Sequence, residues 1–237
     1  MQLLKLLFLL PLFLFLSLTA SAQLSVQVAG GLVSGSPMGP IPEGATGQPG
    51  VRFWGEFGAE YRFAERLGLR LGLQLATKAG RYNTPVSGEQ QAEANIFGAE
   101  VRLPFRFDYE GNVEGLFANR YWQIPLTVAW YNDSRLIPFA GLYWARNARP
   151  YHRGFINIEV SNGLVEIRNQ SFDESAGLRA WDWGLVAGTD FRILDGLGFS
   201  LAAQYGLISI LETNPDGFEG AFRNLYLTGG VYIRINR

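Results

Sequence analysis

His152 is the only histidine of the chain, so it is the first residue to consider for acid–base or metal chemistry. Ser161, Ser171 and Asp173 follow it, and a histidine with a serine and a carboxylate is the set that hydrolases use. The spacing of these residues matches no catalytic motif. We therefore expect His152 to be a solvated loop residue, and we predict no catalytic residue in this chain.

Glu56 and Glu60 are a second candidate, because two carboxylates can act as a general acid and a general base. Their spacing of four strand positions corresponds to about 13 Å along the chain. Arg52, Arg62 and Arg70 surround them in the sequence, so we interpret the five residues as a charge network. Cysteine is absent, which excludes disulfides, thiol catalysis and cysteine-ligated metals. We expect no metal site and no cofactor.

The composition indicates which elements must position these residues. Of 237 residues, 48% are hydrophobic and only 17% are charged, against about 25% charged in a typical soluble domain. Glycine (29 residues) and aromatic side chains (14%) are abundant, which favours strands with tight turns over helices. The net charge of −1 leaves no basic footprint for a nucleic acid.

Residues 1–22 have the pattern of a cleaved secretory signal peptide. Lys5 gives a short positive region, residues 6–18 are almost wholly Leu and Phe, and residues 20–22 (ASA) form a small-residue cleavage site. The apolar run is shorter than the ~20 residues that a membrane helix needs. We expect residues 23–237 to form one exported domain.

Alternation of apolar and polar residues recurs along this domain. In residues 51–63 the odd positions are apolar or small, and the even positions are mostly Arg, Glu, Trp and Gly. A period of two marks a strand with one apolar and one polar face. This pattern, with weaker versions of it, predicts about eight strands, near residues 24–32, 51–63, 67–76, 121–131, 136–145, 181–193, 197–207 and 225–235.

Short and long connections alternate between these strands. Short connections with turn chemistry lie at residues 65–66, 132–135 and 195–196. Long connections lie at residues 33–50, 82–119 and 147–179, and a fourth contains a turn signal at 214–217. The second and third exceed ordinary loop length, so we expect structure within them. In the third, residues 155–160 and 164–168 flank Ser-Asn-Gly, which predicts a hairpin.

The polar faces of the predicted strands are rich in glycine and carry charges of both signs. Glycine on a water-exposed strand costs backbone entropy, whereas inside a narrow barrel it makes room for larger side chains. Opposite charges can pair in such a lumen. The predicted lumen charge network comprises Arg52, Glu56, Glu60, Arg62, Arg70, Asp182, Asp190, Arg192 and Arg234.

The apolar faces, the short turns at one end and the long loops at the other are typical of outer-membrane barrels. We predict an all-β fold: an eight-stranded antiparallel up-and-down transmembrane β-barrel in a Gram-negative outer membrane. Both termini and the short turns would be periplasmic, and the long loops extracellular. We expect Arg146, Arg149, His152 and Arg153 to contact lipopolysaccharide phosphates at the outer leaflet.

Six short segments also carry a family resemblance. They are residues 73–80 (LQLATKAG), 121–126 (YWQIPL), 140–143 (AGLY), 182–188 (DWGLVAG), 204–208 (QYGLI) and 225–232 (LYLTGGVY). Together they resemble the PorT-like outer-membrane β-barrel family from about residue 67 to the end. The resemblance implies the barrel fold and an outer-membrane location. Some members are associated with protein secretion or gliding machinery, and the family offers no catalytic residues to carry over.

Function is expected in the long loops, where binding residues concentrate on a rigid scaffold. Side chains fill an eight-stranded lumen, so a general diffusion pore is not expected. We predict a non-enzymatic barrel whose outer loops bind an envelope or secretion-machinery protein or stabilise the envelope. A narrow channel for a small solute is the alternative, and a rim hydrolase centred on His152 is a third hypothesis. Outer-membrane lipid and lipopolysaccharide are the expected partners, with no nucleic acid.

Overall fold

The computed structural model describes residues 23–39, 44–96, 99–132, 134–160, 165–212 and 221–236. Most of these residues are in β-strands, and the helical segment among them is the 3₁₀ turn η3 (Ser175–Gly177), so none of the described helices could cross a membrane. The strands are β1 (Gln23–Met38), β2 (Thr46–Ala64), β3 (Leu67–Ile96), β4 (Ala99–Trp130), β5 (Leu136–Arg149), β6 (His152–Val160), β7 (Val165–Asp173), β8 (Trp181–Leu194), β9 (Leu197–Gly206) and β10 (Arg223–Asn236).

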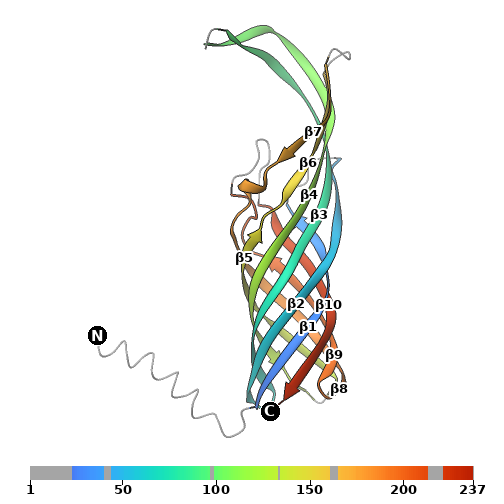
Figure 1. The fold of residues 1–237 in the computed structure, drawn as a ribbon, viewed down its shortest axis with the longest axis vertical. Coiled ribbons are helices and arrows are strands. Elements are labelled where there is room, and N and C mark those ends of the chain that lie inside the picture. Colours follow the sequence, from blue (N-terminus) through green and yellow to red (C-terminus); the bar gives the residue numbers. More distant parts are fainter. Residues whose placement is uncertain are drawn as a thin grey trace, which may run out of the picture.

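Eight of these strands close into an antiparallel barrel (Figure 1). The hydrogen-bonded order is β3-β2-β1-β10-β9-β8-β5-β4, and pairing of β3 with β4 completes the ring. Barrel strands that follow one another in the chain therefore lie side by side in the sheet, as in an up-and-down barrel. The predicted fold class and the eight barrel strands are confirmed.

The period-two pattern sets which side chains face outward. Along the first half of β8, exposed Trp181, Trp183 and Leu185 alternate with buried Asp182 and Gly184. Large apolar side chains are exposed on every barrel strand, and Phe53 reaches 79%. Such a continuous apolar surface is far larger than a water-soluble monomer exposes. It fits contact with lipid.

Tryptophans mark both ends of the apolar surface. Trp122, Trp144, Trp181 and Trp183 are exposed on three neighbouring strands, and the rings of Trp144 and Trp181 stack 4.6 Å apart. Trp130 is exposed eight residues further along β4. Eight strand residues span about 26 Å, and a typical tilt of about 40° reduces this to about 20 Å of membrane thickness. The separation of the Trp122 and Trp130 levels is therefore close to that of aromatic belts at the two membrane interfaces.

The two ends of the barrel differ (Figure 1). Tight turns at residues 65–66 and 195–196 lie at the end where β1 starts and β10 stops, and Gly196 in the second has a φ of +85°. At the other end β3 and β4 continue as a two-stranded ribbon, paired as far as Ile96 and Ala99. We call these the short-turn end and the long-strand end.

The two longest predicted loops are therefore largely strand. The segment 82–119 is the continuation of β3 and β4, and 147–179 contains β6 and β7. The predicted hairpin is confirmed: β6 pairs with β7, and β6 also pairs with the outer part of β4 between Tyr109 and Phe117. The hairpin tip (161–164), the turn signal at 214–217 and the predicted signal peptide (1–22) lie outside the described residues.

Candidate functional site

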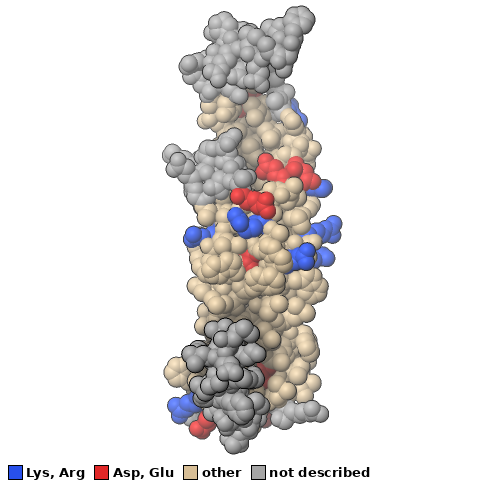
Figure 2. Space-filling model, turned by 90° about the vertical axis from the view of Figure 1, so that its left-hand side faces the viewer, with Lys and Arg blue, Asp and Glu red and all other residues tan. Residues whose placement is uncertain are grey.

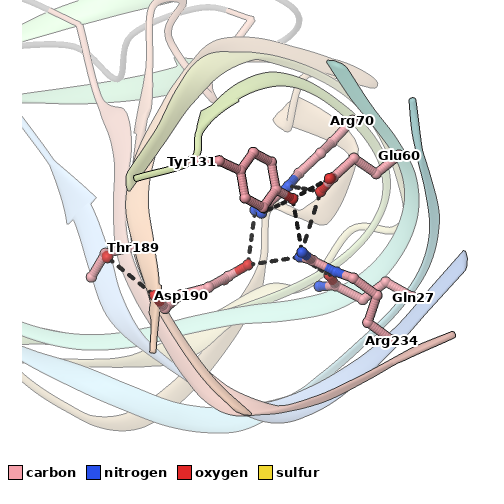
Figure 3. Close-up of polar contacts among 7 residues, drawn as sticks. All are labelled: Gln27, Glu60, Arg70, Tyr131, Thr189, Asp190 and Arg234. Carbon is pink, nitrogen blue, oxygen red and sulfur yellow. Dashed lines mark hydrogen bonds and ion pairs between the residues drawn. The ribbon is translucent and has the colours of Figure 1, made fainter. Parts of the chain in front are cut away.

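An arginine–carboxylate network fills the lumen near the short-turn end (Figure 3). Arg70 on β3 places Nε 2.6 Å from Glu60 Oε2 on β2 and Nη1 2.9 Å from Asp190 Oδ2 on β8. Arg234 on β10 reaches the same two carboxylates, with Nη2 3.1 Å from Asp190 Oδ2 and 3.5 Å from Glu60 Oε2. Two cations and two anions therefore compensate one another across four strands.

Neutral groups complete this network. The Tyr131 hydroxyl donates to Glu60 and accepts a hydrogen bond from Arg234 Nη1 at 2.8 Å. Gln27 Oε1 accepts from Arg234 Nη2 at 2.7 Å. The side chains of the four charged residues are at most 13% exposed. Burying charges is costly unless they are paired and hydrogen-bonded, and Tyr131 and Gln27 supply hydrogen bonds to Glu60 and Arg234 in addition to the ion pairs.

Three glutamines form the next layer. Gln123 Nε2 donates to Gln74 Oε1 at 2.9 Å and to Gln204 Oε1 at 3.1 Å, and Gln204 Nε2 donates to Gln74 Oε1 at 3.1 Å. All three are buried, and they come from β4, β3 and β9. This glutamine layer spans the lumen from β3 and β4 to β9.

A buried lysine forms the third layer, towards the long-strand end. Lys78 is fully buried, and its Nζ lies 3.7 Å from Asp182 Oδ2. The same carboxylate oxygen accepts hydrogen bonds from Tyr143 at 3.0 Å and from Asn224 at 2.6 Å. The rings of Tyr121, Tyr143 and Tyr226 lie with centroids 4.6–5.4 Å from Nζ, a distance at which aromatic faces attract a cation.

Glycines make room for these layers. A methyl group at Gly184 would lie 2.8 Å from the Tyr143 ring, and one at Gly198 would lie 2.6 Å from the Tyr232 ring. Both glycines are on the polar face that the alternation predicted to point inward. The space-making role expected of these glycines is consistent with these contacts.

The structure brings together most of the residues predicted for the lumen charge network. Arg62 stacks its guanidinium 3.6 Å over the Tyr131 ring. Arg62 and Arg192 both line a cavity of about 140 Å³ at the short-turn end. Glu56 lies over Gly72 beside Arg70. Asp182 belongs to the lysine layer rather than to the arginine–carboxylate network.

Arg52 does not join the lumen network, so its position differs from the predicted one. It is exposed, and its Nη1 donates to the carbonyl oxygen of Val51. Between Pro49 and Trp54, β2 advances five residues while its partner β3 advances four, from Gly80 to Ala76. This bulge interrupts the regular alternation.

A band of arginines lies on the outer surface beyond the tryptophans at the long-strand end. Arg146, Arg149 and Arg153 are exposed, and Arg120 is exposed opposite Arg149 on the neighbouring strand. Figure 2 shows charged side chains gathered above a surface zone that carries almost none. Arg153 also pairs with Asp173 at 2.8 Å.

His152 differs from both predictions made for it. It is only 4% exposed and points away from its neighbour Arg153, so it is neither solvated nor available to the outer leaflet. Adjacent strand residues face opposite sides, and β6 directs His152 inward. There its ring stacks on Phe117 with centroids 4.0 Å apart, and Nε2 lies 2.8 Å from Tyr82 Oη.

The described residues around His152 are not arranged as a serine–histidine–carboxylate set, and Ser161 lies outside the described residues. Asp173 pairs with Arg153, and Ser171 lies opposite Phe155 in the β6–β7 register. Ser175 accepts a hydrogen bond from the backbone N–H of His152. Burial lowers the pKa of His152 to about 4, so the ring is neutral at physiological pH. No group of three or more His, Asp or Glu within the described ranges could hold a metal ion.

Sequence reasoning missed Lys78, Gln123 and Tyr82. The alternation of residues 67–76 continues without a break, so the even position 78 faces inward by the same rule that places Gln74. Extending the strand by two residues would have identified the lysine. Nothing in the local pattern indicates that Gln123 meets Gln74 and Gln204, because that contact depends on the stagger of three strands.

Comparisons with known proteins find one family model and several solved structures that are similar to this chain. A model of the outer membrane protein beta-barrel domain matches residues 19–212. Among solved structures, Neisserial surface protein A is 13% identical, with 90% of this chain and 98% of that chain covered, at a TM-score of 0.35. Ail of Yersinia pestis is 11% identical (90% and 97% covered, TM-score 0.39), and OprG of Pseudomonas aeruginosa is 13% identical (89% and 95%, TM-score 0.39). No curated protein matches the sequence.

Proposed function

Since the chain belongs to the outer membrane protein beta-barrel domain family, we propose that it is a non-enzymatic, non-conducting barrel whose long-strand end binds a protein partner of the cell envelope. The observation that carries the proposal is the contrast between the two parts of the molecule. Three buried polar layers fill the lumen, whereas β3, β4, β6 and β7 extend beyond the barrel. A filled lumen disfavours transport, and the extended strands offer a surface to which a protein partner can bind.

The asymmetry of the two ends supports one orientation in the membrane. Outer-membrane barrels have short periplasmic turns and longer extracellular loops. We place the short-turn end, with the start of β1 and the end of β10, in the periplasm. Residues 1–22 would then be the signal peptide that directs export, and β1 starts directly after them at Gln23. Residues 23–237 would form the mature domain.

The arginine band supports contact with lipopolysaccharide in this orientation. Arg120, Arg146 and Arg149 lie next to the level of Trp122 and Trp144, where the outer-leaflet head groups would be. Phosphate groups accept the forked hydrogen bonds of arginine well. Arg146 also lies 5.2 Å from the Trp181 ring, so its guanidinium is held at the level of the belt.

The ribbon of β3 and β4 is the proposed binding element. Beyond Asn83, β3 is paired within the described residues only with β4. The thirteen residues from Thr84 to Ile96 correspond to about 40 Å of extended chain. Exposed strand edges present free N–H and C=O groups that can pair with a further strand. A partner that adds a strand to this edge would use backbone hydrogen bonds for affinity. In a more specific version of this proposal, the partner belongs to a secretion machinery, as for some PorT-like proteins.

Site-specific photocrosslinking in cells tests the proposal. A photoreactive residue at exposed Glu110, at the base of the ribbon, should give a discrete protein adduct, and one at lipid-facing Leu201 on β9 should give none. Replacing residues 88–108 by a short turn should abolish the adduct while the barrel still shifts in mobility on heating before SDS electrophoresis. Equal adducts at both positions, or an adduct that survives the ribbon deletion, would contradict the proposal.

A further inference from the structure

An apolar cavity lies at the long-strand end, beyond the lysine layer. Its volume is about 270 Å³. Its apolar walls come from six residues on the strands and on the segment before β10: Val86, Val113, Ile156, Phe172, Leu211 and Phe222. The cavity lined by Glu60 and Arg234 at the short-turn end, in contrast, is about 140 Å³ and mainly polar.

The strands build this cavity with paired glycines. Gly115 on β4 lies between Tyr82 on β3 and Gly154 on β6, and Gly154 is paired with Phe172 on β7. A methyl group at Gly115 would lie 2.2 Å from the Tyr82 ring, and one at Gly154 would lie 2.6 Å from the Phe172 ring. Each aromatic ring therefore covers a glycine, and both rings line the cavity.

His152 gives the cavity one directional polar group. Its ring is held on three sides: it stacks on Phe117, meets Phe172 edge-on at 5.5 Å, and places Nε2 2.8 Å from Tyr82 Oη. Its Nδ1 is buried and makes no hydrogen bond with the described residues. The nearest carboxylate oxygen, Glu174 Oε2, is 3.5 Å away on a side chain that is 59% exposed.

An unsatisfied polar atom in an apolar site selects its ligand. Leaving a buried donor or acceptor without a partner costs free energy, and a ligand that supplies the partner recovers it. In one tautomer Nδ1 donates and in the other it accepts. A hydroxyl group can do both, so it satisfies Nδ1 in either case.

We propose that this cavity binds a small apolar molecule bearing one hydroxyl group, with the hydroxyl at His152 Nδ1 and the apolar body against Val113, Ile156 and Phe172. Size supports a ligand of one or two rings or a medium-length alkyl chain, because an apolar cavity of roughly 150 Å³ already takes up benzene. This site goes beyond the proposed protein partner, since it uses the inner face of the long-strand end and needs no ribbon edge.

Equilibrium dialysis with 1-naphthol as the probe tests the site. The full barrel in lipid nanodiscs is compared with empty nanodiscs of the same lipid, which corrects for partition into the bilayer. The wild type should bind one additional equivalent of 1-naphthol. Val113→Trp should fill the cavity and remove that equivalent, and Leu116→Trp, on the outer face of the same strand, should retain it. Equal uptake by empty nanodiscs, or full binding by Val113→Trp, would overturn the proposal.

His152→Phe separates the hydrogen bond from the apolar fit. Phenylalanine can keep the stack on Phe117 but offers no polar atom. The variant should bind 1-naphthol about fivefold more weakly, the usual effect of one lost hydrogen bond, and should bind naphthalene as the wild type does. Unchanged binding of 1-naphthol, or the same loss for both probes, would contradict the assignment of Nδ1. The heat-dependent mobility shift on SDS gels verifies that each variant has folded.

Discussion

Arg70 Nη1 lies 2.9 Å from Asp190 Oδ2 and joins β3 to β8, two strands that are not neighbours in the barrel. The same arginine holds Glu60 on β2. The ring of backbone hydrogen bonds closes the barrel wall, and this contact joins opposite sides of the lumen. The stability of the barrel and the non-conducting lumen that we propose thus depend on the same side chains.

Arg70→Met should destabilise the barrel by about 3–5 kcal/mol, because it leaves two buried carboxylates with one cation. The double variant Arg70→Met/Asp190→Leu should recover part of this loss, since it removes a charge of each sign. Urea unfolding in lipid vesicles measures both. Arg66→Met, at an exposed turn position, is the matched control and should change stability by less than about 0.5 kcal/mol. Equal effects of the two single variants would show that the network contributes little.

The lysine layer should respond unequally to loss of its two charges. After Lys78→Met, Asp182 keeps the hydrogen bonds from Tyr143 and Asn224. After Asp182→Asn, the Lys78 ammonium is buried without a carboxylate, with three tyrosine rings as its remaining neighbours. Asp182→Asn should therefore cost about 3–5 kcal/mol, clearly more than Lys78→Met. Unfolding curves of both variants in the same vesicles check the order, and the reverse order would contradict this description of the layer.

Gly198→Ala should destabilise the barrel by about 1–3 kcal/mol through overpacking. The added methyl group would meet the Phe191 carbonyl oxygen at 2.3 Å and the Tyr232 ring at 2.6 Å. Gly55→Ala is the control, because the nearest atom to its methyl group, the Ala29 carbonyl oxygen, is 3.9 Å away. There the substitution should be neutral or slightly stabilising, because it reduces the freedom of the unfolded chain. Thermal unfolding of the two variants in parallel decides whether lumen glycines are there for space.

Acid should loosen the β6–β7 hairpin. Burial lowers the pKa of His152 to about 4 in the folded protein, below the value of about 6.5 for an unfolded histidine. The stability that neutral His152 contributes is therefore complete above pH 6.5 and is lost as pH falls from 6.5 towards 4. The loss reaches at most about 3 kcal/mol, from the difference between the two pKa values. Hydrogen exchange of the β6 amides at pH 7.5 and pH 5, corrected for the intrinsic rate, should show faster opening at pH 5. His152→Phe should remove this dependence, and a wild type without it would contradict the assigned burial.

The barrel could be predicted from the sequence because the lipid face and the lumen impose opposite requirements on neighbouring residues. Leu71 and Leu73 face outward while Arg70 and Gln74 face the lumen. The alternation with a period of two therefore predicts where the strands lie, which of their faces points inward and most of the charged residues that lie in the lumen. The same rule, applied to β6, assigns His152 and Arg153 to opposite sides. The predicted lipopolysaccharide cluster was based instead on closeness in sequence, and it included the inward-facing histidine.

Other features depend on contacts that a single strand does not encode. Arg52 is exposed because β2 has one residue more than β3 at a bulge, and a local pattern does not reveal its partner's length. The meeting of Gln74, Gln123 and Gln204 depends on the stagger between strands that are far apart in the chain. The apolar cavity beside Tyr82 and Phe172 depends on glycines that sit opposite them on neighbouring strands.

Single-channel recording in planar lipid bilayers shows whether the three buried layers close the barrel. Liposome flotation and the heat-dependent mobility shift first establish that the purified protein is inserted and folded. We expect no stable conductance steps for the wild type at any applied potential that the bilayer tolerates. Reproducible steps from the folded, inserted wild-type protein would reveal an open path through the lumen, and the proposed non-conducting barrel would then be wrong.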